Sequence, residues 1–281
     1  MHLGAIMKKK KPQVFFITGA ASGIGAATAR LLASQGHAVM LADINAKGVR
    51  DVAASLGSNA DAVALDITSP AAWEAALDLT YSRFGTLDVL VNNAAIVVTG
   101  NARDVPVAHH QRTININFMG PLTGSLATLE RFRAQGHGHV VTVCSMVSFM
   151  PFPGIASYGA SKQALRAFHH ALAFEERNTG VDFTIVHPTA TETPMLEQEE
   201  RDDACGFAFL ADPVSPEFVA ETVVTAIRRK SIEVFMPPEQ AKVIRSLGTD
   251  APRMRKLYAQ MEEIGRSAQH ERRQSHNPNS H

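Results

Sequence analysis

The octapeptide TGAASGIG, residues 18–25, is the stretch that decides the fold of this 281-residue chain. An apolar run, QVFFITG, leads into it, and AATARLLASQG, with apolar residues at helical spacing, follows it. Glycine permits the tight backbone geometry of a strand-to-helix turn, here at Gly19, Gly23 and Gly25. It also lets a pyrophosphate group approach the helix N-terminus, where free N–H groups and the helix dipole favour anions. The stretch therefore predicts a strand, a phosphate-binding turn and a helix.

The next apolar run, HAVMLAD, ends in Asp43. A carboxylate at this position accepts hydrogen bonds from both hydroxyls of an adenosine ribose and repels a 2′-phosphate. No Arg or Lys lies in the glycine turn or directly follows Asp43. The sequence therefore favours NAD over NADP as cofactor, and a solvated turn residue is the alternative interpretation of Asp43.

Apolar runs and helical segments alternate along the chain up to Pro238. This alternation is typical of a parallel sheet covered by helices on both faces. We therefore predict an α/β fold, with one doubly wound domain and a seven-stranded parallel sheet over residues 12–238. A flexible lead-in is expected before it (1–11), and a helical extension (239–268) and a disordered polar tail (269–281) after it. The expected strands are residues 13–19, 37–43, 62–68, 87–95, 138–145, 181–189 and 232–237.

The extension contains the segment PRMRKLYAQMEEIGRSAQ, in which Met254, Leu257, Met261 and Ile264 recur at helical spacing. A helix with one apolar stripe needs a surface to cover. Three surfaces remain open: its own domain, a neighbouring subunit, and the mouth of a substrate pocket. Membrane attachment is disfavoured, because the stripe is narrow and the helix carries acidic as well as basic residues.

Composition excludes several classes of protein. The formal net charge is zero, so no long-range field recruits nucleic acid or an anionic membrane. The two cysteines, Cys144 and Cys205, cannot form a disulfide framework, and a reducing, cytoplasmic compartment is the simpler expectation. No apolar run reaches the ~20 residues that a membrane span needs. The twelve histidines lack metal-ligand spacing with a carboxylate or thiolate, so no metal site is predicted.

The segment YGASKQALRAFHHAL places Tyr158 and Lys162 one helical turn apart, on one face of a predicted helix. An ammonium group near a phenol stabilises the phenolate and lowers the phenol pKa from ~10. The pair therefore suggests a tyrosine that exchanges protons. Taken alone, a Tyr and a Lys at this spacing are more often surface neighbours, and Ser145, at the end of a strand, is more often a loop serine.

Together these motifs resemble the short-chain dehydrogenase/reductase family. The resemblance covers roughly residues 12–237 and is carried by the TGAASGIG turn, the sequence NNAA, a Ser thirteen residues before YGASK, and a strand that ends in proline. It implies a Rossmann-type fold and hydride transfer between a nicotinamide and a carbinol carbon. It also implies a catalytic tetrad of Ser145, Tyr158, Lys162 and Asn117.

The resemblance assigns a role to each tetrad residue. Tyr158 exchanges the proton with the substrate oxygen, and Ser145 holds that oxygen by a hydrogen bond. Lys162 also binds the nicotinamide ribose hydroxyls, with Tyr158 beside the same ring. Asn117 holds a water for a proton relay through Lys162; a backbone-bonding polar group in the core is the alternative for Asn117.

The remaining cofactor contacts are also implied by the resemblance. They are expected from the glycine turn, from the ends of three strands and from the segment after the sixth strand: Gly19, Ser22, Gly23, Ile24, Gly25, Asp43, Asp66, Ile67, Asn93, Ala94, Thr191 and Thr193. Thr189 stands where the family usually has glycine, which puts the local turn in question.

The expected small-molecule substrate is a lipophilic secondary alcohol or ketone, steroid-, retinoid- or fatty-chain-like, because apolar residues dominate the segments near Ser145 and after Thr193. An NADP-dependent carbonyl reductase, a dinucleotide-sensing binding protein without turnover, and an epimerase or dehydratase are the alternatives. The helices near residues 117–132 and 161–177 resemble those through which family members form homodimers and homotetramers. No nucleic-acid partner is expected.

Overall fold

The computed structural model describes residues 12–276. The predicted lead-in, residues 1–11, and the last five residues of the predicted tail lie outside the described residues. The core of the described chain is one parallel sheet of seven strands in the order β3-β2-β1-β4-β5-β6-β7. This confirms the predicted α/β, doubly wound architecture. The strands are β1 (Val14–Thr18), β2 (Ala38–Asp43), β3 (Ala60–Ala64), β4 (Val89–Asn92), β5 (Gly138–Val143), β6 (Val181–Pro188) and β7 (Glu233–Met236).

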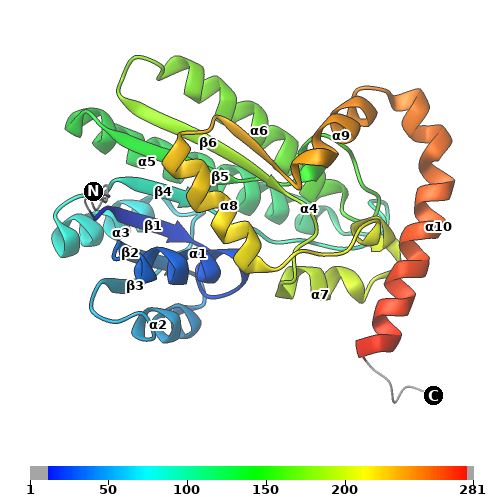
Figure 1. Cartoon of the computed structure of the whole chain (residues 1–281), viewed down its shortest axis with the longest axis horizontal. Helices are drawn as coiled ribbons and strands as arrows, with labels where there is room; N and C mark the ends of the chain where they lie inside the picture. Colours follow the sequence, from blue (N-terminus) through cyan, green and yellow to red (C-terminus); the bar gives the residue numbers. More distant parts are fainter. Residues whose placement is uncertain (1–11, 277–281) are drawn as a thin grey trace, which may run out of the picture.

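Helices cover both faces of the sheet (Figure 1). On one face, α1 (Gly23–Ser34), α2 (Ala46–Ala54) and α8 (Pro216–Arg229) bury aliphatic side chains against the strands. On the other face lie α3 (Pro70–Phe84), α5 (Gly120–Gln135) and α6 (Ala156–Glu175), with Trp73 and Phe132 fully buried. Strand residues alternate between the two apolar clusters: Phe15 and Ile17 face one, and Val14 and Phe16 the other. Burial on both faces explains why the strands are continuous apolar runs.

A single turn of π-helix interrupts the long helical stretch after β4. The chain forms α4 (Val107–Ile114), then the π segment Asn115–Met119, then α5. Asn117 lies in the middle of the π turn. Single π turns inside α-helices are frequently found at functional sites, because the extra residue turns a side chain toward a new direction.

Four shorter helical elements complete the wall beyond the sheet. They are η2 (Met146–Ser148), α7 (Pro194–Glu200), η3 (Asp203–Phe209) and η4 (Pro238–Gln240). Two C-terminal helices follow, α9 (Ala241–Gly248) and α10 (Ala251–His276). In Figure 1 the strand arrowheads point toward the side on which α7, α9 and α10 lie. The predicted helical extension is therefore present and stands at the carboxyl ends of the strands.

The prediction of disorder from residue 269 is wrong for residues 269–276, which are the last turns of α10. Side-chain contacts to the body of the molecule hold these turns in place. Arg272 pairs with Glu192 and Glu200 at 2.6 and 2.9 Å, and Arg273 pairs with Asp203 at 2.5 Å. Polar composition suggested a solvated tail, but here the polar residues find fixed partners.

The apolar stripe of α10 covers its own domain. Met254, Leu257 and Met261 pack on a cluster formed by Met146, Met150, Phe235, Ile244 and Leu247, whereas Ile264 is exposed. Of the three surfaces that the sequence left open, α10 covers its own domain and also borders the cavity described below, which is lined by Met146, Met150, Ile244, Leu247 and Met261. Among residues 12–276, no helix combines the length and apolar character that crossing a bilayer demands.

Candidate active site

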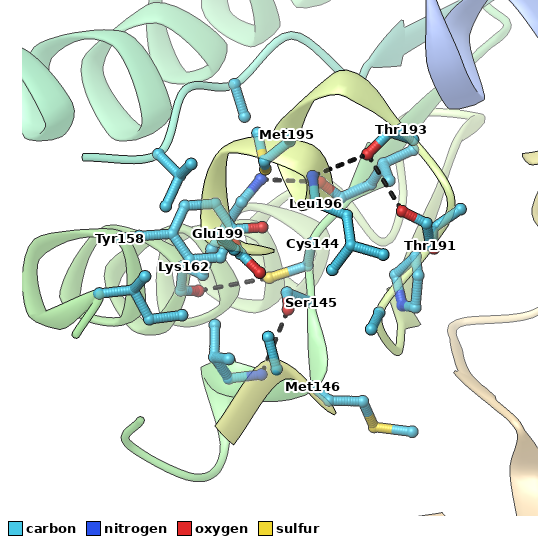
Figure 2. A pocket seen from close by; sticks show the side chains of 18 of the residues that line it. Cys144, Ser145, Met146, Tyr158, Lys162, Thr191, Thr193, Met195, Leu196 and Glu199 are labelled. Atoms are coloured by element: carbon cyan, nitrogen blue, oxygen red, sulfur yellow. Dashed lines mark hydrogen bonds between the residues drawn. The ribbon is translucent and has the colours of Figure 1, made fainter. Parts of the chain in front are cut away.

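A cavity of about 780 Å³ opens at the carboxyl ends of the strands. This is the edge at which doubly wound sheets bind ligands, because the loops there diverge. The cavity extends from the glycine turn after β1, past the residues that follow β5 and β6, to α7, α9 and α10. Figure 2 shows a close view of part of it, with side chains from the segment after β5, from α6 and from α7 around one space.

The glycine turn needs its glycines. Gly19 and Gly23 have φ of 67° and 51°, in the region that side chains rarely adopt. A Cβ on Gly19 would lie 2.8 Å from Cα of Ala94, and one on Gly25 would lie 2.3 Å from the carbonyl oxygen of Gly19. α1 begins at Gly23, and its N-cap, Ser22, makes no side-chain cap hydrogen bond. Gly19, Ser22, Gly23 and Ile24 line the cavity; Gly25 packs behind them.

Asp43, at the end of β2, is held at the cavity edge by the backbone. Its carboxylate accepts hydrogen bonds from the N–H of Ala21 at 3.0 Å and of Asn45 at 2.9 Å. Asp66 lies further along the same edge and accepts from the N–H and hydroxyl of Thr68, which lowers its pKa. Ile67 lines the cavity beside it.

The segment after β4 is fastened to the glycine turn. The Asn93 side chain donates to the carbonyl oxygens of Thr18 and Gly19 at 2.9 and 3.2 Å. The Thr18 hydroxyl in turn accepts from the N–H groups of Asn93 and Ala94. The Asn93 side chain thus serves the turn, and Asn93 and Ala94 both line the cavity.

Ser145, Tyr158 and Lys162 come together, as predicted. Ser145 follows β5 with extended backbone and caps η2 through the Val147 N–H. Tyr158 and Lys162 lie on α6, both buried, with Lys162 Nζ 5.6 Å from the centre of the Tyr158 ring. Lys162 Nζ donates to the Val143 carbonyl at 3.1 Å. All three side chains line the cavity.

The pKa of Tyr158 is raised, contrary to the prediction from the nearby ammonium group. Burial has the largest effect, and negative charge on Glu199 and Cys144 acts in the same direction. A hydrogen bond with Ser145 lowers the pKa but does not outweigh burial. Burial also lowers the pKa of Lys162. In the chain by itself, desolvation is therefore the stronger effect on both groups.

Asn117 lies in the π turn, fully buried, and its amide is bonded to the backbone of Ile96. Its Oδ1 accepts from Ile96 N–H at 2.9 Å and its Nδ2 donates to the Ile96 carbonyl at 2.8 Å. Nδ2 also lies 3.2 Å from the Ser161 hydroxyl. The alternative that the sequence left open for Asn117, a backbone-bonding core residue, describes the geometry of this side chain. The contact with Ser161 places Asn117 beside α6.

The segment after β6 is relaxed in spite of Thr189. Lys230 is the one non-glycine residue with positive φ in the described part of the chain, so Thr189 has ordinary backbone geometry. Its N–H donates to the Met236 carbonyl and continues the β6–β7 pairing. Thr191 donates to the Thr189 carbonyl, and Thr193 caps α7 by accepting from the Leu196 N–H. Thr191 and Thr193 line the cavity.

Sequence reasoning missed two groups at the site. Glu199 on α7 is buried and lines the cavity, and burial raises its pKa to about 7. His187, fully buried in β6, bonds to the Ser145 carbonyl at 3.2 Å, the Ser148 hydroxyl at 3.0 Å and the Glu233 carboxylate at 3.1 Å. Glu199 stands three residues after Leu196, a spacing that places both on one face of a helix, and this spacing was the only sequence signal that Glu199 is buried. No comparable signal marks His187.

No group of three or more His, Cys, Asp or Glu residues suited to a metal ion occurs between residues 12 and 276. The cysteines Cys144 and Cys205 are both buried and free. Cys144 donates to the carbonyl oxygen of Lys162 at 3.3 Å.

Comparisons with known proteins agree with the geometry. The model of the short chain dehydrogenase family matches residues 13–204. A 3-alpha-(or 20-beta)-hydroxysteroid dehydrogenase of Mycobacterium tuberculosis is 32% identical over 185 residues, 66% of this chain and 71% of that protein. The uncharacterized oxidoreductase YxnA of Bacillus subtilis is 31% identical over 276 residues, 96% of this chain and 77% of that protein.

Among solved structures, a 3-ketoacyl-(acyl-carrier-protein) reductase from Brucella melitensis, complexed with NADH, is similar with a TM-score of 0.72 and 29% identity. The likeness covers 79% of this chain and 95% of that one. Fold, site and relatives together define an α/β oxidoreductase. The chain belongs to the short chain dehydrogenase family, as the sequence resemblance predicted.

Proposed function

We propose that this protein is an NAD-dependent oxidoreductase that interconverts a lipophilic secondary alcohol and the corresponding ketone. One observation carries the proposal. A single continuous cavity joins the glycine turn, the Ser145 and Tyr158 side chains, and a wall of apolar residues. A dinucleotide, a proton-exchanging group and an apolar substrate therefore have adjacent places in one space.

The residues at the glycine turn fit a dinucleotide. The turn leaves a hollow in which a Cβ on Gly19 or Gly25 would collide with backbone, and the α1 N-terminus has no side-chain cap. This suits a pyrophosphate, which takes its hydrogen bonds from backbone N–H groups. Asp43 is oriented by two backbone N–H groups and suits ribose hydroxyls; its charge favours NAD over NADP. Ile67, Ala94, Thr191 and Thr193 complete the proposed contacts.

When bound, the nicotinamide supplies the hydride chemistry. We assign the proton to the Tyr158 hydroxyl. Because its pKa is raised, Tyr158 is protonated at neutral pH, which is the state that a general acid needs for ketone reduction. Ser145, beside it, holds the substrate oxygen by a hydrogen bond. Lys162 binds ribose hydroxyls, and Asn117 fixes the segment after β4 against α6 through Ile96 and Ser161.

The apolar part of the cavity supports a lipophilic substrate. It is lined by side chains from η2, the loop before α6, η3 and the C-terminal helices, namely Met146, Val147, Met150, Phe152, Ile155, Phe207, Leu210, Val243, Ile244, Leu247 and Met261. A sugar or polyol would need more hydrogen-bonding groups there. The name of the mycobacterial relative, a hydroxysteroid dehydrogenase, agrees with an apolar substrate.

A screen for NADH formation tests the proposal. The full chain is assayed with cyclic and long-chain secondary alcohols, with polyols as controls and with NADP in parallel. Turnover of apolar secondary alcohols with NAD is expected. No turnover of any alcohol with either dinucleotide would contradict the proposed activity, and better use of NADP would contradict the assignment to Asp43.

Substitution Tyr158→Phe tests the proton donor. The ring stays and the hydroxyl is lost, so turnover should fall by on the order of a hundredfold or more, while NAD affinity is retained. Turnover is measured on the best alcohol from the screen, and NAD affinity by calorimetry. Tyr81→Phe is the matched control, since Tyr81 lies on α3, outside the cavity. Equal turnover of the Tyr158 variant and the wild type would sink the assignment.

A further inference from the structure

Glu199 is a buried carboxyl group with no partner in the described part of the chain. It is 7% exposed, and neither a hydrogen bond nor an ion pair to its carboxyl oxygens occurs among residues 12–276. Burial is the cause of its raised pKa, with no neighbouring cation acting on it. A desolvated carboxyl group is costly to a protein unless something satisfies it.

The carboxyl group of Glu199 faces the substrate part of the cavity. Glu199 lines the cavity together with Leu196 of the same helix and with Tyr158 of α6. Its charge acts on the pKa of Tyr158 and of Cys205 in η3, so it lies near both. Figure 2 shows Glu199 close to Tyr158 on one side of the space. The acidic residues Asp43, at the end of β2, and Asp66, in the segment after β3, line the part of the cavity near the glycine turn.

The backbone that carries Glu199 is fixed by α10. Gln269, 2% exposed, donates its amide protons toward the carbonyl oxygens of Glu199, Glu200 and Asp202 at 3.0, 3.2 and 2.9 Å. Arg272 holds the neighbouring Glu200 carboxylate at 2.9 Å. These contacts hold the backbone of Glu199 in place, and a side chain that is preorganised in this way binds a ligand at lower entropic cost.

We propose that Glu199 binds a hydrogen-bond donor on the substrate, a hydroxyl or an ammonium group attached to an apolar skeleton, and rejects substrates that carry a carboxylate. The inference rests on the proposed function for the identity of the cavity as a substrate site. The apolar wall holds the skeleton, and the donor supplies the hydrogen bond that the Glu199 carboxyl group does not receive from the described part of the chain. A carboxylate in the same place would face like charge at low dielectric.

Binding of three matched amphiphiles tests this without turnover. Octylammonium, octan-1-ol and octanoate are titrated into the full chain by calorimetry at pH 8, with and without NAD. Octylammonium or octan-1-ol is expected to bind ~10- to 100-fold more tightly than octanoate, the range for one charge-assisted hydrogen bond. A preference for the ammonium over the alcohol identifies a cationic substrate group, and the reverse identifies a hydroxyl.

Two variants separate Glu199 from general charge effects. Glu199→Gln should remove most of the discrimination against octanoate. Glu197→Gln should leave it unchanged, because Glu197 is on the same helix, exposed, and paired with Arg201. Equal affinity for the three ligands, including no binding of any, would overturn the inference. So would a Glu199→Gln variant that keeps the wild-type order.

The alcohol screen distinguishes failure of this inference from failure of the proposed function. If plain and carboxylate-bearing alcohols are turned over equally well, and kcat and KM are unchanged in Glu199→Gln, the proposed oxidoreductase activity is supported. The recognition role of Glu199 is then contradicted. A Glu199→Gln variant that lowers kcat on every alcohol and keeps the wild-type order of affinities for the octyl ligands would show that Glu199 acts on the reaction through Tyr158 and does not recognise the substrate. Selective binding of the octyl ligands without turnover of any alcohol would contradict the proposed activity and support the Glu199 subsite.

Discussion

Two carboxyl groups at the site have opposite environments. Asp43 receives two backbone N–H groups and lies at the cavity edge, so its charge is supported by hydrogen bonds. Glu199 receives none in the described chain, and burial raises its pKa from 4.5 to about 7. The two carboxyl groups therefore differ in what surrounds them: that of Asp43 accepts two backbone hydrogen bonds, whereas that of Glu199 is buried and has a pKa near neutral pH.

The raised pKa of Glu199 predicts a pH-dependent cost to stability. A carboxyl group whose pKa is raised on folding favours the folded state below its unfolded value, and this contribution is lost as pH rises through the folded value. The difference between 4.5 and about 7 corresponds to ~3 kcal/mol. Relative to the wild type, Glu199→Gln should therefore gain up to about 3 kcal/mol in unfolding free energy between pH 5 and pH 8.5.

Urea unfolding of both proteins at the two pH values measures this gain. Taking the difference between variant and wild type cancels the other titrating groups that the two proteins share. Glu197→Gln should show no such gain, because that carboxylate is exposed. A stability difference between Glu199→Gln and the wild type that is the same at pH 5 and pH 8.5 would mean that the Glu199 carboxyl is well solvated.

The charge of Asp43 is expected to set the cofactor preference. Asp43→Asn keeps an oxygen that can accept a backbone hydrogen bond and removes the repulsion of a 2′-phosphate. The ratio of kcat/KM for NAD to that for NADP should fall about tenfold, since one like-charge contact at a partly solvated site is worth on the order of 1–2 kcal/mol. Asp51→Asn, on the exposed side of α2 and paired with Lys47, is the matched control. An unchanged ratio would show that other groups discriminate.

At the scale of elements, α7 and α10 form one unit although 50 residues separate their ends in sequence. The Gln269 amide nitrogen lies within hydrogen-bond distance of three carbonyl oxygens at and just after the end of α7. Arg272 and Arg273 pair with acidic residues around it. The C-terminal helix therefore acts as the support of the substrate-facing segment. The family model ends at residue 204, so this support lies beyond the part of the chain that the family model matches.

Removal of the Gln269 amide should loosen this unit. Gln269→Ala leaves the carbonyl groups of Glu199, Glu200 and Asp202 buried with one donor fewer, at a cost of roughly 1–3 kcal/mol. We expect a lower melting temperature and a higher KM for apolar alcohols, with unchanged NAD affinity. Gln274→Ala, at an exposed position of the same helix, should change none of these. A Gln269 variant indistinguishable from the wild type would show that other contacts suffice.

Much of this architecture was predictable because local patterns and tertiary burial agree. The two strands beside the glycine turn, β1 and β2, are apolar except at their last residues, since both faces of a parallel sheet are covered. Their predicted and observed ends differ by at most one residue. The expected strand at residues 62–68 was misplaced toward the C-terminus. β3 is an edge strand, only partly buried, and ends at Ala64, so its composition carried a weaker signal. α7 and η3 were missed because their shape depends on α10.

The site was predictable where a motif fixes both residue type and spacing. Ser145, Tyr158 and Lys162 met as expected, because a strand end and a helix face bring them together. The pKa of Tyr158 was not predictable in direction, since burial depends on the whole cavity wall. The bonding of Asn117 to Ile96 and of His187 to Ser145 joins segments distant in sequence, and no local pattern encodes such pairs.

On the scale of the whole molecule, the outer faces of α5 and α6 remain apolar in part. Leu126 is 46% exposed and Phe174 is 66% exposed, whereas Leu129, Leu165 and Leu172 of the same helices are buried in the core. The sequence resemblance implies a homodimer or homotetramer, and we propose that these exposed groups lie in its contacts. Light scattering of the full chain at micromolar concentration should give two or four times the mass of one chain.

Single substitutions locate the proposed contact between copies. Leu126→Glu or Phe174→Glu should shift the mass toward that of one chain, because a buried charge opposes association. Phe218→Glu should leave the mass unchanged, since Phe218 lies on α8, across the sheet, and is similarly exposed. A wild-type chain that is monomeric at micromolar concentration would refute the assembly.

The contacts between Gln269 and the end of α7 have a consequence for the order in which the parts of the molecule form during synthesis. The ribosome delivers the chain from its N-terminus, and folding begins with what has emerged. The glycine turn, the strands and the Tyr158 helix have all been made before the first residue of α10 exists. The glycine turn, the sheet and α6 are thus able to fold while the ribosome is still synthesising the C-terminal helices. The segment that carries Glu199 acquires its support only after α10 has been synthesised, so a chain that stops before Gln269 contains the residues of the glycine turn and lacks this support.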